Sequence, residues 1–283
     1  MTEDNPLASC RILALDDHAI QVKIFQKILE TNGYTQVTGI SDPLQCLPLH
    51  HENPFDLVIV DLDMPNLNGF GVIQQLKEEA ENDFLPIIVV TGSDEKQDML
   101  RALKLGARDF VTRPVHREEL VHRVNHLLRI RLAYKKVPTA LRPRLARIDE
   151  RALRMGRILV VEDDAAQRVI IEKLLKMGNY SDVSGLSDPG VLRSFMASQS
   201  APFEVVILDL HLPGLSTREA IEVIHEMTPG KNKPYILAIT SDDSNEVRWD
   251  AFRDGAVDIL HKPLDREIFL ARMDNLIELR LLV

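Results

Sequence analysis

Two stretches of this sequence almost repeat each other: LVIVDLDMP at residues 57–65 and VVILDLHLP at residues 205–213. Each opens with four apolar, largely β-branched residues and then becomes polar at an aspartate. A short apolar run of this kind is typical of a strand that is buried on both faces of a parallel sheet. The pair therefore predicts two copies of one α/β unit, each built around a central buried strand.

Three further pairs of stretches recur in the same order along the chain. They are RILALDD at 11–17 with RILVVED at 157–163, IIVVT at 87–91 with ILAIT at 236–240, and GARDFVTRP at 106–114 with GAVDILHKP at 255–263. Helical patterns separate the apolar runs, so strand and helix alternate about five times in each copy. This alternation predicts a doubly wound α/β sheet with right-handed crossovers, in which ligands lie beyond the carboxyl ends of the strands.

The helical pattern that follows residue 17 carries one apolar stripe. It consists of Ile20, Ile24 and Ile28 together with Phe25 and Leu29. Residues at this spacing share one side of a helix, so the sequence predicts an amphipathic helix with this stripe as its apolar side.

The composition is that of a soluble folded protein with about two domains. The chain has 283 residues, of which 45% are hydrophobic and 27% are charged, and its formal net charge is −9. The two cysteines, Cys10 and Cys46, provide neither a disulfide framework nor a CxxC zinc pair. The first ten residues lack a signal peptide pattern, and no apolar run approaches the ~18 residues of a membrane helix. We therefore expect a cytoplasmic protein with no membrane partner.

Charge divides the chain into two acidic domains and a basic connector. Residues 129–157 carry 10 basic and only 2 acidic side chains. We predict a first domain over residues 1–130, a basic linker over 131–156 and a second domain over 157–283. The linker is interpreted as a solvated segment docked on its neighbours, and nucleic acid as an unlikely partner.

Part of this linker shows helical periodicity. Leu141, Leu145, Ile148, Ala152 and Met155 follow each other at alternating spacings of about 3 and 4 residues, as on one side of an α-helix. The pattern predicts a short amphipathic helix that begins near Pro143, because proline is tolerated in the first turn.

Polar side chains stand at the ends of the predicted strands in both copies. In the first copy these are Asp16, Asp17, Asp61, Thr91 and Arg113, and in the second they are Glu162, Asp163, Asp209, Thr240 and Lys262. Three carboxylates at one sheet edge repel each other unless they share a proton or a hard cation. Oxygen ligands with open water positions suit Mg²⁺. With a hydroxyl and a cation nearby, the central aspartate is equipped to attack phosphorus.

These residues resemble the receiver domain of two-component response regulators, twice over. The resemblance covers nearly all of both copies and rests on the four motifs in their order. It implies two flavodoxin-like (βα)5 domains in tandem with strand order 2-1-3-4-5. It also implies that a histidine kinase or a phosphotransfer protein donates a phosphoryl group to an aspartate, with one Mg²⁺ per domain.

The resemblance also assigns roles to single residues. Asp61 and Asp209 are implied as phospho-acceptors, and Thr91 and Thr240 as switch hydroxyls. The implied metal ligands are Asp16, Asp17, Asp61 and the backbone carbonyl of Asp63 in the first copy, and Glu162, Asp163, Asp209 and the backbone carbonyl of His211 in the second. Lys262 is implied as the cation that binds the phosphoryl group.

The two copies depart from the family pattern in three places. Arg113 stands where the family has the lysine, and it replaces a compact ammonium by a planar fork. Thr217 replaces the glycine that the first copy keeps as Gly69, so we expect a different loop after the second acceptor. The aromatic switch position holds Phe110 in the first copy but Ile259 in the second.

Two side chains next to the acidic pairs have simpler interpretations. Asp164 is expected to cap the following helix. Whether His18 touches the site is left open by the sequence.

The leading hypothesis is a response regulator with two receiver domains, no output domain in this chain and no catalytic output. Its partners would be the phosphodonor and a downstream protein effector, with possible homodimers or pairing of the two receivers. One alternative is the regulatory front part of a longer effector, such as a diguanylate cyclase or an HD-type phosphodiesterase. Another makes the first receiver a degenerate adaptor, because of Arg113. A distant one is a DxD-type phosphatase, from Asp61 and Asp63, but His211 breaks that motif in the second copy.

Overall fold

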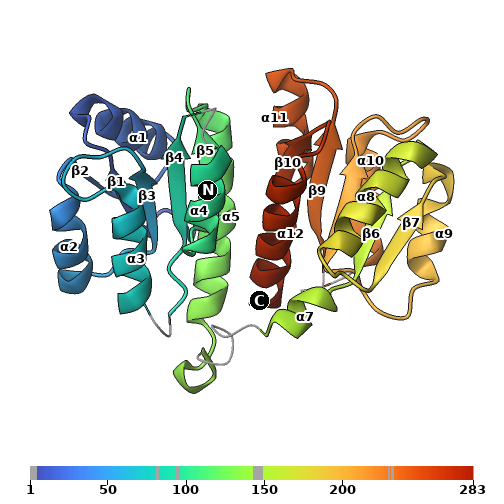
Figure 1. The fold of residues 1–283 in the computed structure, drawn as a ribbon, viewed down its shortest axis with the longest axis horizontal. Coiled ribbons are helices and arrows are strands. Elements are labelled where there is room, and N and C mark those ends of the chain that lie inside the picture. Colours follow the sequence, from blue (N-terminus) through green and yellow to red (C-terminus); the bar gives the residue numbers. More distant parts are fainter. Residues whose placement is uncertain are drawn as a thin grey trace. The chain divides into compact units, whose positions relative to one another are not determined.

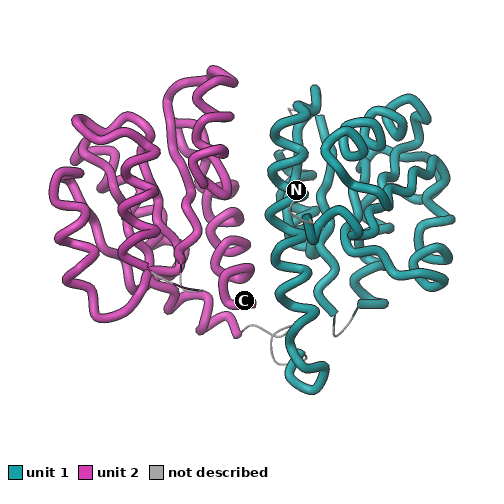
Figure 2. Tube along the Cα trace, turned by 180° about the vertical axis from the view of Figure 1, so that it is seen from behind, with its two compact units in different colours: residues 1–146 teal, residues 147–283 magenta. Residues whose placement is uncertain are grey.

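The computed structural model describes residues 5–80, 83–92, 96–142, 149–228, 230 and 233–282. The chain divides into two compact units, unit 1 over residues 1–146 and unit 2 over residues 147–283 (Figure 2). Among the described residues, no helix combines the length and the apolar character that a membrane span requires.

Unit 1 is a parallel sheet of five strands in the order β2-β1-β3-β4-β5, with helices on both of its faces (Figure 1). Its strands are β1 (Arg11–Leu15), β2 (Gln36–Ile40), β3 (Leu57–Asp61), β4 (Ile87–Thr91) and β5 (Asp109–Thr112). Its helices are α1 (Ala19–Thr31), α2 (Cys46–Glu52), α3 (Gly69–Glu79), α4 (Lys96–Lys104) and α5 (Arg117–Lys135), with a 3-10 turn η1 (Pro43–Gln45) before α2. The predicted strand order 2-1-3-4-5 is confirmed.

Unit 2 repeats this topology in the order β7-β6-β8-β9-β10. Its strands are β6 (Ile158–Val161), β7 (Val183–Leu186), β8 (Val205–Asp209), β9 (Tyr235–Thr240) and β10 (Asp258–His261). Its helices are α8 (Ala165–Met177), α9 (Leu192–Ala197), α10 (Thr217–Met227), α11 (Asn245–Asp254) and α12 (Arg266–Leu281), with a 3-10 turn η3 (Pro189–Val191) before α9.

The central strand of each unit is apolar throughout because both of its faces are covered. In β8, Val206 and Leu208 belong to the core beneath α9, α10 and α11. The alternate residues Val205 and Ile207 belong to a second core, beneath α8 and α12. Successive side chains of a strand point to opposite faces, so a strand between two helical layers has no solvated side. Burial of each such aliphatic side chain contributes about 1.5 to 3 kcal/mol.

The apolar side of α1 differs from the predicted stripe. Val22, Phe25 and Leu29 are the buried residues of α1, whereas Ile20 is 74% exposed and Ile24 is 42% exposed. The prediction is right for Phe25 and Leu29 and wrong for the two isoleucines. At 3.6 residues per turn, Ile20 and Ile24 lie on the opposite side of the helix from Val22. Apolar residues cover most of this helix, so spacing alone did not single out the buried row.

Within the predicted linker the structure shows η2 (Thr139–Leu141) and a short helix α7 (Glu150–Arg154). Residues 143–148, where we predicted that a helix begins, lie outside the described residues. Helix α7 begins after Asp149, whose side chain accepts a hydrogen bond from the backbone nitrogen of Arg151. Leu153 packs against the core of unit 2, while Met155 is exposed. Leu141 and Ala152 are exposed as well, so the predicted apolar stripe is wrong at each of its described members.

Several basic side chains of the linker region are bound within their own units. The Nη1 atom of Arg131 donates to Asp83 Oδ1 at 2.6 Å, and Lys135 forms an ion pair with Asp56, both in unit 1. Arg154 of α7 forms an ion pair with Asp274 of unit 2. These contacts neutralise part of the basic strip.

Candidate functional site

The polar residues predicted at strand ends gather at the carboxyl edge of each sheet. In unit 1, the ends of β1, β3 and β4 bring together Asp16, Asp61 and Thr91, and all three are buried. Arg113 follows β5 directly, and its backbone nitrogen donates to the carbonyl of Thr91 at 2.9 Å. Parallel strands all end at the same edge, so residues far apart in sequence meet there.

One nitrogen of Arg113 binds both buried carboxylates of unit 1. Its Nη2 atom lies 2.9 Å from Asp16 Oδ2 and 2.6 Å from Asp61 Oδ1. This nitrogen carries two protons, so both are used in these two bonds. Burial raises the pKa of Asp61, while the hydrogen bond and charge of Arg113 oppose that rise. The carboxyl of Asp61 is thus a desolvated group held in place by a guanidinium.

Unit 2 places Lys262 in the equivalent position. Its Nζ atom lies 2.8 Å from Glu162 Oε2 and 2.9 Å from Asp209 Oδ2. Glu162, Asp209 and Thr240 are buried, and the backbone nitrogen of Lys262 donates to the carbonyl of Thr240 at 2.8 Å. Burial acts to lower the pKa of Lys262, but the two carboxylates outweigh it and the pKa is raised. The lysine therefore stays charged between them.

In unit 2, burial disfavours the charged form of Glu162. Burial raises the pKa of Glu162, Lys262 acts against that rise, and the nearby charge of Asp209 adds to it. The native state thus holds a proton on this carboxyl more tightly than the unfolded chain does. Stability linked to this group is fully present below the ordinary glutamate pKa and is lost as the pH rises through the raised value.

We therefore expect Glu162→Gln to be more stable than the wild type at neutral pH in buffer without Mg²⁺. The amide removes the charge that burial and Asp209 disfavour, and the gain should be on the order of 1 kcal/mol. The difference should shrink as the pH falls toward the ordinary glutamate value, where Glu162 becomes neutral too. Urea unfolding across this pH range measures both quantities. A variant less stable than the wild type at neutral pH would contradict the electrostatic account.

Each unit groups side chains that suit a divalent cation. In unit 2 the group consists of Glu162, Asp163 and Asp209, whose ligand atoms lie within 4.8 Å of one another. This all-oxygen set fits Mg²⁺, which binds through one or two carboxylates and keeps several waters. In unit 1 the group consists of Asp16, Asp17 and His18. The group in unit 1 thus includes an imidazole, whereas the group in unit 2 consists of carboxylates only.

The loops after Asp61 and Asp209 share one backbone feature and differ in another. Asn66 and Gly214, at equivalent positions, both have left-handed backbone, with φ of 68° and 71°. A Cβ atom on Gly69 would lie 2.3 Å from the carbonyl oxygen of Asp61, so only glycine fits that backbone. In unit 2 the hydroxyl of Thr217 instead reaches the carbonyl of Leu210 at 3.5 Å. The loop differs at this point, as predicted.

The positions at which the resemblance implies an aromatic switch, Phe110 and Ile259, also differ in their surroundings. Phe110 of β5 is half-buried and packs against the core of unit 1. Ile259 of β10 is buried in the core of unit 2 that also contains Phe203 and Phe252. The two positions thus differ both in side-chain type and in burial.

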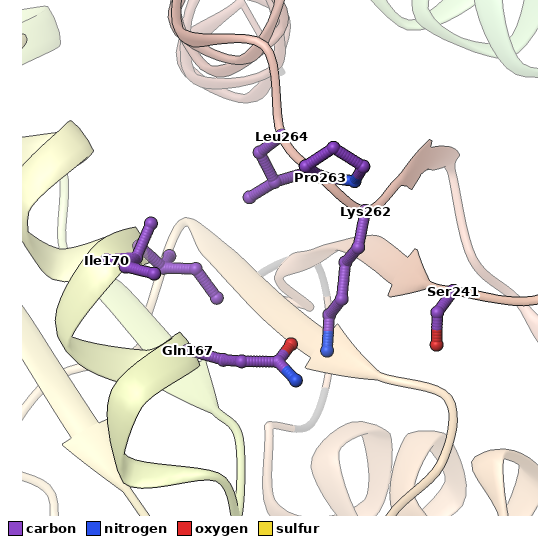
Figure 3. A pocket seen from close by; sticks show the side chains of 7 residues that line it. Gln167, Ile170, Ser241, Lys262, Pro263 and Leu264 are labelled. Atoms are coloured by element: carbon purple, nitrogen blue, oxygen red, sulfur yellow. The ribbon is translucent and has the colours of Figure 1, made fainter.

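A cavity of about 390 Å³ opens beside Lys262 in unit 2. Figure 3 shows the Lys262 side chain extending between Gln167 of α8 and Ser241, which follows β9, with Ile170 and Pro263 lining the same space. Lys262, whose ammonium binds Asp209, is thus one of the residues that line this cavity.

Two contacts at the acidic pairs were not predicted. Arg168 of α8 donates to the carbonyl of Glu162 at 3.1 Å, so a second cation lies next to the site of unit 2. The position of Arg168 one turn into α8 could have indicated this contact, but arginines on helix surfaces are too common for one of them to be singled out.

His18 contacts Asp17, so the question that the sequence left open is decided in favour of contact with the site. Asp164 caps α8 by accepting from the backbone nitrogens of Ala166 and Gln167, as predicted.

Comparisons with known proteins match both units. The sequence model described as the response regulator receiver domain matches residues 12–125 and 158–274. The response regulator PleD of Caulobacter vibrioides is 25% identical over 276 residues, which is 95% of this chain and 59% of PleD. The chain thus spans about three-fifths of the length of that relative. Protein PilH of Pseudomonas aeruginosa is 35% identical over 118 residues, covering 42% of this chain and 97% of PilH.

Solved structures with similar folds include the receiver domain of the Francisella response regulator 1452. It is 28% identical and covers 43% of this chain and 98% of its own, with a TM-score of 0.40. A crystal structure described as a putative two-component system response regulator/GGDEF domain protein is 17% identical. It covers 95% of this chain and 98% of its own, with a TM-score of 0.41.

Proposed function

Since this chain belongs to the response regulator receiver domain family and carries two such domains in tandem, we propose that it is switched by phosphoryl transfer to Asp209 and, more slowly, to Asp61. One observation carries the proposal. In both units a buried aspartate at the end of the central strand is bound by a cation from beyond the fifth strand, next to an acidic pair. A nucleophile, a cation for phosphoryl oxygens and donors for a metal thus share one sheet edge.

In the proposed reaction a carboxylate oxygen of Asp209 attacks the phosphorus of a phosphohistidine on a kinase or phosphotransfer protein. An O–P bond forms while the P–N bond breaks, and the electron pair of that bond remains on the imidazole, which takes up a proton. Lys262 shifts from the carboxylate to a phosphoryl oxygen and offsets its charge. A Mg²⁺ ion held by Glu162, Asp163 and Asp209 would supply further charge neutralisation at the phosphoryl group. The backbone carbonyl of His211 is proposed as a further ligand.

Unit 1 is proposed to use the same roles with a different cation. Asp61 would be the acceptor, Asp16 and Asp17 with the carbonyl of Asp63 the metal ligands, and Thr91 the hydroxyl that follows the phosphoryl group. Thr240 would have that last role in unit 2. The two protons of Arg113 Nη2 are committed to Asp16 and Asp61 in the unphosphorylated state. We propose that this makes Asp61 the slower acceptor, so that unit 1 works mainly as an adaptor.

A second candidate keeps this chemistry but makes the chain the regulatory part of a longer effector. The observation in its favour is that PleD, which matches nearly the whole chain, is longer than the matched region. The reading frame beyond Val283 decides between the candidates. In either case we propose residues 131–156 as a linker between the receivers, and protein contacts as the means by which the signal leaves them.

The proposal is tested by incubating the full chain with Mg²⁺ and acetyl phosphate and measuring intact masses of the wild type, Asp61→Asn and Asp209→Asn. We expect one phosphoryl group to appear first, and this group should be lost in Asp209→Asn. A second, lost in Asp61→Asn, should form at a rate roughly tenfold lower, which corresponds to about 1.4 kcal/mol in the barrier. If Asp209→Asn is phosphorylated as fast as the wild type, Asp209 is not the acceptor.

A further inference from the structure

The acidic site of unit 1 is divided into two halves by the two oxygens of Asp16. Its Oδ2 atom is taken by Arg113 at 2.9 Å, on the same side as Asp61. Its Oδ1 atom accepts from the backbone nitrogen of His18 at 2.9 Å and lies 3.6 Å from the Nδ1 atom of the same residue. The first half therefore already holds a cation, the guanidinium. The second half faces His18 and Asp17.

The imidazole of His18 completes this second half. Its Nδ1 atom lies 2.8 Å from Asp17 Oδ1, so the ring nitrogen is directed at both carboxylates of the acidic pair. An Nδ1–H donor is needed for that contact, which means that a proton occupies the position between the imidazole and the carboxylate. Neutral imidazole can carry its proton on Nε2 instead, and Nδ1 then offers a lone pair to a metal ion.

Unit 2 shows why the imidazole is available in unit 1 alone. Asp164, at the position equivalent to His18, uses its carboxylate to cap α8 by accepting from Ala166 and Gln167. His18 occupies the same N-cap position of α1 but makes no side-chain capping hydrogen bond. Its side chain is 73% exposed and is turned to the acidic pair. The ring can therefore bind a cation without any loss to the helix.

We propose that His18 is a metal ligand of unit 1, and that it makes this site prefer a borderline transition cation such as Co²⁺, Ni²⁺ or Zn²⁺ over Mg²⁺. This inference deepens the proposed function, because it concerns the cation of the same receiver. Imidazole suits transition cations, whereas carboxylate and water suit Mg²⁺. Asp16 Oδ1, Asp17 and His18 hold the cation on the side away from Arg113. Unit 2, with oxygen donors only, keeps the preference for Mg²⁺.

Co²⁺ is a suitable probe, since it is paramagnetic and shifts the NMR signals of a ligating histidine ring. The full-length wild type should bind one Co²⁺ that persists in excess Mg²⁺, with a shifted imidazole signal from one of the nine histidines. His18→Asn should lose that signal, and its affinity for Co²⁺ at this site should fall roughly tenfold or more. Asparagine is among the best N-cap residues, so the variant is expected to fold.

His51→Asn is the matched control. The ring of His51 pairs with a single exposed carboxylate, that of Glu79 at 2.9 Å, and no change in Co²⁺ affinity is expected on its removal. If His18→Asn keeps the wild-type affinity for Co²⁺ in excess Mg²⁺, or keeps the shifted histidine signal, the proposal is wrong. The masses of acetyl phosphate-treated His18→Asn are measured in parallel. If this variant gains no phosphoryl group on Asp209, the proposed function is contradicted, whereas the proposal that His18 is a metal ligand is not.

Discussion

Lys262→Met is expected to slow phosphoryl transfer from acetyl phosphate to Asp209 by roughly 100-fold, the typical effect of removing one preorganised donor from a developing negative charge. The Nζ atom of Lys262 is within 2.9 Å of Asp209 and within 2.8 Å of Glu162. Without it, no ammonium is left to follow the phosphoryl oxygens away from the carboxylate. The measurement is the rate at which the phosphorylated mass of the full chain appears, in an Asp61→Asn background so that only unit 2 is counted.

The same substitution should also destabilise unit 2. It leaves Glu162 and Asp209 buried together without their shared cation, and removal of one partner from a buried ion pair costs about 3 to 5 kcal/mol. Addition of Mg²⁺ should restore part of this loss, because a bound cation again compensates the carboxylates. Urea unfolding with and without Mg²⁺ measures both effects.

Lys262→Arg is the control that separates charge from shape. It keeps a cation at this position, so its free energy of unfolding should stay within about 1 kcal/mol of the wild type. If the methionine and arginine variants lose equal stability, the loss does not come from the charge. If Lys262→Met is phosphorylated at the wild-type rate, the ammonium has no part in the transfer.

The strands were predictable from the sequence because strands that are buried on both faces consist almost entirely of apolar residues. Each central strand is covered on both faces, so its run of apolar residues is uninterrupted until an aspartate emerges at the sheet edge. The buried side of a helix is harder to predict from the sequence when apolar residues lie around most of its circumference. In α1 the exposed Ile20 and Ile24 look the same in sequence as the buried Phe25, and only the sheet beneath the helix decides which row is covered.

The site was predictable as a set of residues but not as a set of contacts. Strand topology alone brings Asp16 and Asp61 to one edge, since both follow buried parallel strands. Which oxygen of Asp16 faces Arg113 depends on side-chain rotamers that no motif encodes. The direction of the His18 ring is likewise not encoded in a motif. The ring makes no side-chain capping hydrogen bond and contacts Asp17 instead. These contacts add to the differences between the two receivers that the sequence already shows at Arg113 and Lys262.

Arg113→Lys is expected to raise the rate of phosphoryl transfer to Asp61 roughly tenfold, or about 1.4 kcal/mol in the barrier. The planar guanidinium holds Asp16 and Asp61 at once through a single nitrogen. A lysine ammonium is compact and sits on a flexible stem, so it can leave the carboxylate and follow the phosphoryl oxygens. The rate is measured with acetyl phosphate and Mg²⁺ in an Asp209→Asn background, so that the added mass comes from unit 1 alone.

The reciprocal exchange replaces the lysine of unit 2 by arginine. Lys262→Arg should slow transfer to Asp209 toward the rate of wild-type Asp61, because it introduces the fork where the flexible ammonium was. Arg117→Lys is the matched control for unit 1, since Arg117 is exposed and contacts only the amide oxygen of Asn32, at 3.3 Å, among the hydrogen bonds described for it. It should leave the rate at Asp61 unchanged. If Arg113→Lys also leaves that rate unchanged, the guanidinium does not limit unit 1, and the slower transfer has to come from the metal side of the site, where His18 replaces the cap residue of unit 2.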